Sequence, residues 1–363
     1  MTQKHGTGIE WTHLEGTKGE TWNPVVGCSL ASPGCTNCYA MDFAGLRLDR
    51  EGGPAHYRGT TKVVNGKRVW TGHVALAEHK LIEPLRWTKP RTIFVNSMGD
   101  VFHEDVPDEW IDRVFAVMSL APQHTFIVLT KRAERMRKYF AEAVGRDGSV
   151  MTATRGYGIC IEREMHIREA MQPFASLPGA DHGSAVRFPL PNVWLGISCE
   201  DQTRADERVI HLLATPAAVR LVSGEPLLGG IDFTRLRIDD DTRLDALQSY
   251  TSKRLEGGHW EHFPNGNPSL DWVIVGGESG SGARPMHPGW ARSIRDQCKA
   301  AKVPFFFKQH GEYVTAPSNQ HLDREHIFLS RDWDFVRVGK KAAGRLLDGR
   351  EHVEFPRVVG GGV

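Results

Sequence analysis

Short apolar runs alternate with amphipathic segments along most of the chain. The runs are rich in valine, isoleucine and phenylalanine, and the segments after them carry apolar residues at helical spacing. Such runs lie at 74–78, 92–97, 125–130, 193–198, 218–223, 272–277 and 304–309, and a weaker first strand is expected near 21–26. The pattern predicts parallel strands that are covered on both faces.

The intervening segments predict helices at 79–87, 107–120, 131–143, 203–213 and 288–301. Up to eight strand–helix repeats result, so we expect an α/β fold in the form of a complete or partial TIM-type (β/α) barrel. A doubly wound open sheet is the main alternative, because strand order cannot be derived from one sequence.

Two polar, glycine-rich stretches, 144–191 and 230–269, interrupt the alternation and predict surface insertions. We therefore expect one barrel domain over 1–313 that carries both insertions, followed by a C-terminal extension over 314–363. A smaller basic segment, 51–70, has Asn65-Gly66 at the tip of a predicted hairpin.

The chain has 363 residues, with 45 lysines and arginines against 44 aspartates and glutamates. This balance gives no global reason for tight nucleic-acid binding, although a local basic patch is compatible with it. The polar N-terminus does not resemble a signal peptide, and no apolar run is long enough to span a bilayer. We expect a cytoplasmic protein without a membrane partner, in a compartment where thiols bind metals rather than form disulfides.

Three of the six cysteines lie in one short loop. Cys28, Cys35 and Cys38 have the spacing C-x6-C-x2-C, and prolines and glycines keep the loop out of helix and strand. Three thiolates leave a tetrahedral zinc site one ligand short, and no second C-x2-C or H-x3–5-H motif supplies the fourth. A 4Fe–4S cluster can be held by three cysteines with one iron left open. The spacing favours the cluster, and zinc with a distant fourth ligand is the alternative.

The chain resembles the phage-associated three-cysteine-motif family in blocks that span most of its length: WNPVVGC, SPGCTNCYA, TIFVNSMGDVFHEDVP, NVWLGISCEDQ and WVIVGGESGSGARPM. This family is regarded as distantly related to radical S-adenosylmethionine enzymes such as spore photoproduct lyase. The resemblance implies a 4Fe–4S enzyme that uses S-adenosylmethionine, receives electrons from a flavodoxin or ferredoxin, and acts on a nucleic-acid base or nucleotide. The first cysteine gap is six residues here, whereas those enzymes usually have three.

Polar residues follow the predicted strands where a parallel sheet collects its functional groups. We predict catalytic roles for Glu200, Glu225, Lys131 and Lys308. We predict cofactor contacts for Asn96, Asp100, Ser198, Gly276, Gly277, Glu278, Ser279 and Arg284. Helix capping by Asp100 and Ser198, or a closed salt-bridge network among the charged groups, is the structural alternative.

Two other functions are open at this point. One is a zinc-containing module that binds a nucleotide or a protein. The other is a 4Fe–4S enzyme that uses the open iron as a Lewis acid without S-adenosylmethionine, with which the long first cysteine gap is compatible.

Overall fold

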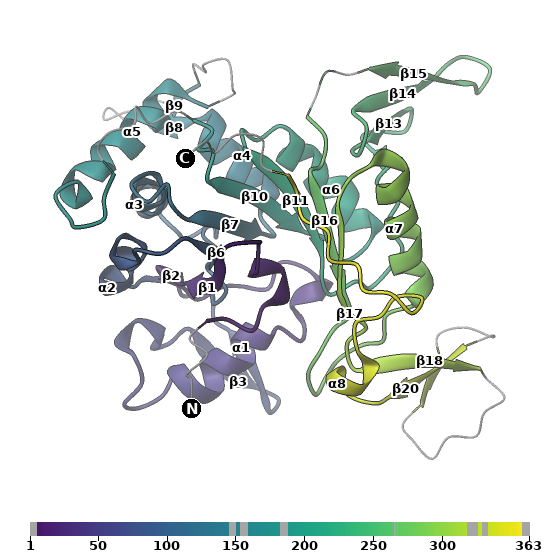
Figure 1. The fold of residues 1–363 in the computed structure, drawn as a ribbon, viewed down its shortest axis with the longest axis horizontal. Coiled ribbons are helices and arrows are strands. Elements are labelled where there is room, and N and C mark those ends of the chain that lie inside the picture. Colours follow the sequence, from purple (N-terminus) through teal and green to yellow (C-terminus); the bar gives the residue numbers. More distant parts are fainter. Residues whose placement is uncertain are drawn as a thin grey trace.

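Seven parallel strands form the central sheet of the protein (Figure 1). The computed structural model describes residues 6–144, 150–152, 159–181, 188–264, 266, 268–317, 326–328 and 333–357. The strands are β1 (Lys18–Trp22), β6 (Arg91–Val95), β7 (Thr125–Thr130), β10 (Val193–Ser198), β11 (Val219–Gly224), β16 (Trp272–Gly276) and β17 (Phe305–Gln309). Each strand pairs in parallel with the next one along the chain.

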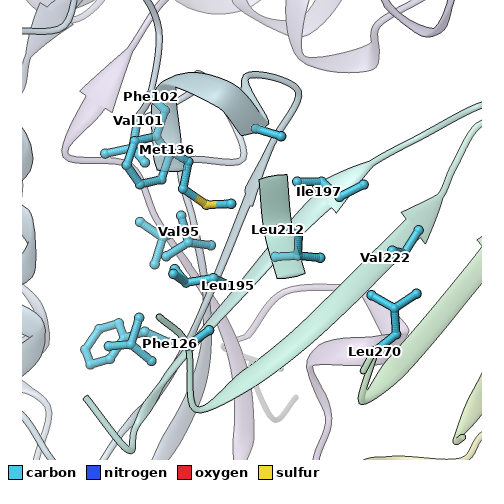
Figure 2. Packing of buried hydrophobic residues seen from close by; sticks show 14 of the residues in the cluster. Val95, Val101, Phe102, Phe126, Met136, Leu195, Ile197, Leu212, Val222 and Leu270 are labelled. Atoms are coloured by element: carbon cyan, nitrogen blue, oxygen red, sulfur yellow. The ribbon is translucent and has the colours of Figure 1, made fainter. Parts of the chain in front are cut away.

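One face of this sheet packs against helices. They are α3 (Asp108–Ser119), α4 (Ala133–Ala141), α6 (Gln202–Leu213) and α7 (Pro288–Ala301). Because side chains alternate along a strand, Leu195 and Ile197 join the buried cluster that these helices complete. Figure 2 shows both of them close to Leu212 of α6.

The two ends of the chain cover the other face, so both faces of the sheet are covered, as the sequence predicts. Trp194 and Trp272 point to this side, where Trp11 from the 3-10 helix η1 (Glu10–Thr12) joins their cluster. Phe355 packs there as well, with its ring 5.4 Å from that of Trp272. The hollow of the sheet is therefore filled with side chains.

The strand order distinguishes between the two predicted architectures. A doubly wound sheet reverses its strand order part-way, whereas these strands follow chain order throughout. The result is a curled, half-barrel parallel sheet surrounded by helices, which is compatible with a partial TIM-type barrel. In the described part of the chain, β1 and β17 are the sheet edges and do not pair with each other.

Three predicted elements differ from the structure. The run at 74–78 does not join the main sheet, because β5 (Ala75–Leu76) pairs antiparallel with β2 (Val25–Val26). The predicted helix 79–87 is two short turns, α2 (Glu78–Leu81) and η5 (Pro84–Arg86). The segment 230–269 contains a four-stranded antiparallel sheet: β12 (Leu236–Arg237), β13 (Thr242–Asp245), β14 (Tyr250–Arg254) and β15 (Trp260–Pro264).

The remaining elements lie around the sheet. The cysteine loop contains η2 (Pro33–Cys35) and leads into α1 (Tyr39–Phe43), the π-helical turn η3 (Ala44–Leu48), η4 (Ala55–Tyr57) and the predicted hairpin of β3 (Thr61–Val64) and β4 (Lys67–Trp70). The first insertion includes β8 (Ala143–Val144), β9 (Val150–Met151), α5 (Ile161–Met171) and η6 (Gln172–Phe174). The C-terminal region has β18 (Tyr313–Pro317), β19 (His326–Phe328), β20 (Trp333–Arg337) and α8 (Lys340–Ala343). Among the described helices, none is long and apolar enough to cross a membrane.

Candidate functional site

A cavity of about 980 Å³ opens at the carboxyl ends of the parallel strands. The cysteine loop and the residues that follow most strands of the sheet contribute to its wall. Twelve of the fifteen residues predicted from the sequence line it: Cys28, Cys35, Cys38, Asn96, Asp100, Lys131, Ser198, Glu225, Gly277, Glu278, Ser279 and Lys308. A larger hollow of about 1420 Å³ lies at the opposite ends of the strands and includes none of the predicted residues.

The three cysteines of the loop are free and half-buried. Burial and, to a lesser extent, the charge of Asp100 raise the pKa of Cys28 to about 12, against the opposing charge of Arg132. Burial also raises the pKa of Cys38, against the N–H groups of Met41 and Ala40. In the part of the chain that the structure describes, no three His, Cys, Asp or Glu side chains are arranged as a set of metal ligands. Because their pKa values are raised, the Cys28 and Cys38 thiols keep their protons near pH 7. A bound cation would favour their thiolate forms.

Arg132 connects the sheet to the cysteine loop. Its Nη1 donates to Asp100 at 3.0 Å and to Cys28 Sγ at 3.7 Å. Its Nη2 donates to the carbonyl and hydroxyl oxygens of Ser29, at 3.2 and 2.7 Å, and its Nε donates to Glu104 at 2.8 Å. Ser29 also hydrogen-bonds to His103 Nε2 at 2.8 Å. The guanidinium thus fixes the start of the loop beside Cys28.

Asp100 holds Arg132 in this position. Its carboxylate accepts hydrogen bonds from the Thr130 hydroxyl, from the N–H groups of Lys131 and Phe102, and from Arg132. The Asp100 and Arg132 side chains are 7% and 5% exposed. Asp100 therefore supports Arg132 and also lines the cavity, and its predicted contact with a cofactor stays a prediction.

Replacing Arg132 with lysine tests this support. Lysine keeps the positive charge but loses the planar fork that reaches Asp100, Glu104 and Ser29 together. We expect the free energy of unfolding to fall by about 2 kcal/mol, the range for lost hydrogen bonds to charged groups. Urea unfolding measures this change. As a control, Arg345→Lys alters an exposed pair with Glu351 and should leave the free energy of unfolding nearly unchanged.

Glu200 holds the middle of the cysteine loop. It lies behind the cavity wall with its side chain 1% exposed, and it accepts hydrogen bonds from Gly34 N at 3.2 Å and from Arg208 Nη1 at 3.2 Å. Burial alone would raise the pKa of Glu200, but hydrogen bonding to Ser32 and the charges of Lys131 and Arg208 outweigh it and lower this pKa. Glu200 stays ionised as an anchor for the loop.

Glu278 holds the end of the loop before the third cysteine. It accepts from Asn37 Nδ2 at 3.1 Å, from Arg284 N and Nε at 2.8 Å each, and from Arg284 Nη2 at 2.6 Å. Arg284 is absent from the cavity wall, and Asn37 also donates to the Gly282 carbonyl at 2.6 Å. Both partners of Glu278 are thus protein groups that attach the cysteine loop to the loop after β16.

The two predicted glycines, Gly276 at the end of β16 and Gly277 directly after it, lie in tight packing. A Cβ on Gly277 would lie 2.0 Å from the His310 carbonyl oxygen, so two backbones touch here. A Cβ on Gly276 would lie 3.3 Å from Lys308 Cβ. Ser279 lines the cavity beside them. The close contacts of this turn are with the protein itself.

Four polar residues of the cavity wall make fewer hydrogen bonds and ion pairs with the described part of the protein than Asp100 and Glu278 do. Asn96, in the left-handed conformation (φ 58°), accepts from Val25 N at 3.4 Å, while its buried Nδ2 has no partner among the described residues. Lys308 donates to Glu225 at 2.6 Å, and both side chains are partly exposed. Lys131 makes no ion pair within the described chain. Ser198 contributes its carbonyl to Arg208 at 2.7 Å.

Arg132, Ser29 and Asn37 were not among the residues predicted for the site. Arg132 comes two residues after a strand end, so its position offered a signal. Ser29 and Asn37 act through their position inside the cysteine loop, and their partners become apparent only in the fold.

The chain belongs to a family described as protein of unknown function (DUF5131), whose model matches residues 6–356. No curated protein and no solved structure matches the chain at a significant level. The fold and the site define an α/β protein with a three-thiol cavity at the carboxyl ends of its parallel strands.

Proposed function

We propose that the chain is an iron–sulfur enzyme of the radical S-adenosylmethionine type that acts on a nucleic-acid base or nucleotide. Cys28, Cys35 and Cys38 would hold a 4Fe–4S cluster. The observation that carries the proposal is that three free thiols line one cavity at the carboxyl ends of the strands. Three sulfur donors on one loop suit iron and leave one coordination position open. The resemblance to three-cysteine-motif proteins supports the same chemistry.

The residues around the thiols have roles that fit this proposal. Arg132 beside Cys28 would offset part of the negative charge of three thiolates. The unpaired Nδ2 of Asn96 would be satisfied by an acceptor on a bound ligand. Glu225, Lys308 and Lys131 would orient the polar groups of cofactor and substrate. The bound cluster would supply the electron that cleaves S-adenosylmethionine, delivered by a flavodoxin or ferredoxin.

We further propose that the curled sheet is a partial TIM-type barrel, open between β1 and β17. Its support is the parallel pairing in chain order with helices on one face. In barrels of this class the site lies at the carboxyl ends of the strands, where the three-thiol cavity lies.

The zinc alternative needs a fourth protein ligand beside the loop. His103, in the loop after β6, is one candidate, but its Nε2 bonds to Ser29 and its Nδ1 accepts from Asp105 N at 3.1 Å. Both ring nitrogens are already engaged, so His103 would first have to break these bonds. This disfavours a closed zinc site with His103 as the fourth ligand.

Anaerobic reconstitution of the full chain with iron and sulfide tests the proposal. We expect about four iron and four sulfide per chain, and a change in the electron paramagnetic resonance spectrum of the reduced cluster when S-adenosylmethionine is added. One zinc without acid-labile sulfide would support the zinc module instead. A cluster whose spectrum ignores S-adenosylmethionine would support the Lewis-acid enzyme.

A further inference from the structure

Residues 39–70 form a lobe outside the central sheet, which we call the basic lobe. It contains α1, η3, η4 and the hairpin of β3 and β4, and Figure 1 shows α1 and β3 together there. Its inner side is a small apolar core that includes Met41, Tyr57 and Trp70, against which Cys28 and Cys38 pack. The lobe therefore supports the cysteine loop on one side and meets solvent on the other.

The solvent side of the basic lobe carries cations that form no ion pair with the described residues. Six cations and three acids give the lobe a formal charge of +3, so the rest of the chain carries −2 of the total of +1. The cations are Arg47, Arg50, Arg58, Lys62, Lys67 and Arg68. Among the described residues none of these six forms an ion pair, whereas Arg132, Arg163, Arg208 and Arg284 elsewhere all do.

The acids of the lobe do not neutralise these cations by direct contact. Asp49 accepts hydrogen bonds from Gly59 N at 2.9 Å and from Thr61 N at 2.7 Å, so it serves the fold of the lobe. All the cations except the half-buried Arg68 are exposed. The lobe thus presents a local positive surface on a chain whose remainder is close to neutral.

Exposed aromatic and apolar side chains lie among these cations. Tyr39 is 58% exposed and Phe43 is 46% exposed. The Arg47 guanidinium lies over the Phe43 ring, 5.8 Å from its centroid. Cations that follow a phosphate backbone, interleaved with rings on which bases stack, are the pattern of single-strand binding surfaces.

The basic lobe is continuous with the three-thiol cavity. Tyr39, Phe43, His56 and Tyr57 line that cavity together with the cysteines. A base is small enough to enter a cavity of about 980 Å³, whereas a folded acidic protein would only cover its mouth. A base in a single strand is already unpaired and can be turned into such a cavity at low cost.

We propose that the basic lobe docks a single-stranded nucleic acid and presents one of its bases to the three-thiol cavity. The reaction of the base in the cavity rests on the proposed function. The docking of the strand on the basic lobe does not require the cluster. Four of the six cations are arginines, whose planar guanidinium groups bind phosphate through two parallel hydrogen bonds. DNA and RNA strands both carry the phosphate groups that these arginines would bind. The proposed substrate is therefore a single strand of either kind and not a free nucleotide.

Fluorescence anisotropy of the full chain tests the docking. The probes are fluorescein-labelled strands of mixed sequence, about 20 nucleotides long, one of DNA and one of RNA, titrated at several salt concentrations. The variant Arg58→Gln/Lys62→Gln/Lys67→Gln/Arg68→Gln should bind at least about tenfold more weakly near 50 mM salt. The slope of log affinity against log salt should fall by about 2 to 3.

A matched control removes the same charge elsewhere. The variant Lys253→Gln/Arg254→Gln/Lys299→Gln/Arg350→Gln changes four exposed cations outside the basic lobe that also lack ion pairs in the described chain. Its formal charge drops by the same four units, so a loss caused by net charge alone would be equal in both variants. We expect the control to bind within about threefold of the unchanged chain.

A second variant avoids the charge question. Phe43→Ala removes one exposed ring and should weaken strand binding about tenfold without lowering the thermal midpoint of unfolding. Equal losses in the two charge variants would overturn the inference, as would failure of the unchanged chain to bind either strand. A lobe variant that leaves strand binding intact but slows reduction by a flavodoxin would assign the surface to the electron donor instead. A chain that binds the strand but takes up no iron contradicts the proposed function alone.

Discussion

Changing Cys28, Cys35 or Cys38 to alanine, one at a time, should reduce bound iron from about four per chain to less than one after anaerobic reconstitution. A cluster with an open iron has only three protein ligands, so the loss of one leaves too few to hold it. Iron and acid-labile sulfide analysis, together with the visible absorbance of the cluster, measures the outcome. The fold should survive, because the three thiols are only half-buried.

The other three cysteines are the matched controls. Cys160, Cys199 and Cys298 are free and fully buried, and burial raises the pKa of Cys199 and of Cys298. Buried, protonated thiols behave as small apolar side chains. Their alanine variants should keep the iron and lose about 1 kcal/mol of stability each. If Cys199→Ala removed the iron, the site would have four cysteines and the open-iron mechanism would be wrong.

Six strands of the main sheet were predictable because each is a short apolar run. The exception is β1 (Lys18–Trp22), which is largely polar and lies ahead of the strand expected near 21–26. Trp272–Gly276 and Phe305–Gln309 are buried along nearly their whole length. Their sequences therefore lack the alternation of apolar and polar residues that is typical of surface strands. The order of the strands was not predictable, since it depends on pairings between distant segments. The packing of Trp11 and Phe355 into one hollow is a contact of the same kind.

The four strands within 230–269 were missed for the opposite reason. Tyr250–Arg254 and Trp260–Pro264 are mostly exposed, and they carry lysine, arginine, glutamate and histidine. A small sheet with solvent on its faces leaves no apolar run in the sequence. The run at 74–78 is apolar and was therefore wrongly assigned to the main sheet. Its Ala75 and Leu76 pair with Val25 and Val26 in a separate two-stranded sheet.

The candidate site was predictable in place but not in its internal contacts. Because parallel strands end at one edge, residues such as Asn96, Lys131 and Lys308 could be expected to line one cavity, and they do. The partners of Glu200 and Glu278 could not be expected, because Gly34 and Asn37 lie 166 and 241 residues away along the chain. The predicted acids thus include two anchors of the cysteine loop and one, Glu225, whose hydrogen bond within the described residues goes to Lys308.

Glu200→Gln should lower the free energy of unfolding by about 3 to 5 kcal/mol and also reduce iron uptake by the cysteine loop. The carboxylate is 1% exposed and its partner Arg208 is 6% exposed, so the substitution leaves a buried positive charge without its counter-ion. It also weakens the bond to Gly34 N, which fixes the loop between Cys28 and Cys35. Urea unfolding and iron analysis measure the two effects.

The pH dependence of this loss follows from the lowered pKa of Glu200. A carboxyl whose pKa is lower in the folded state stabilises the fold above its unfolded pKa, about 4.5, and loses that contribution as pH falls through the folded value. The stability gap between the unchanged chain and Glu200→Gln should therefore be largest near neutral pH and shrink below pH 4.5. Unfolding curves at several acid pH values check this.

Glu225→Gln is the contrasting variant, because Glu225 also follows a strand of the sheet and also pairs with a cation. Its partner Lys308 is 15% exposed and Glu225 itself 20%, so water replaces part of the lost ion pair and the cost should stay near 1 kcal/mol. The cluster should be retained, while the affinity for a ligand in the cavity should fall, because groups held for a ligand contribute little to the fold. Equal stability losses in both variants would show that Glu225 is scaffold as well, and an unchanged stability in Glu200→Gln would mean that the cysteine loop does not depend on this anchor.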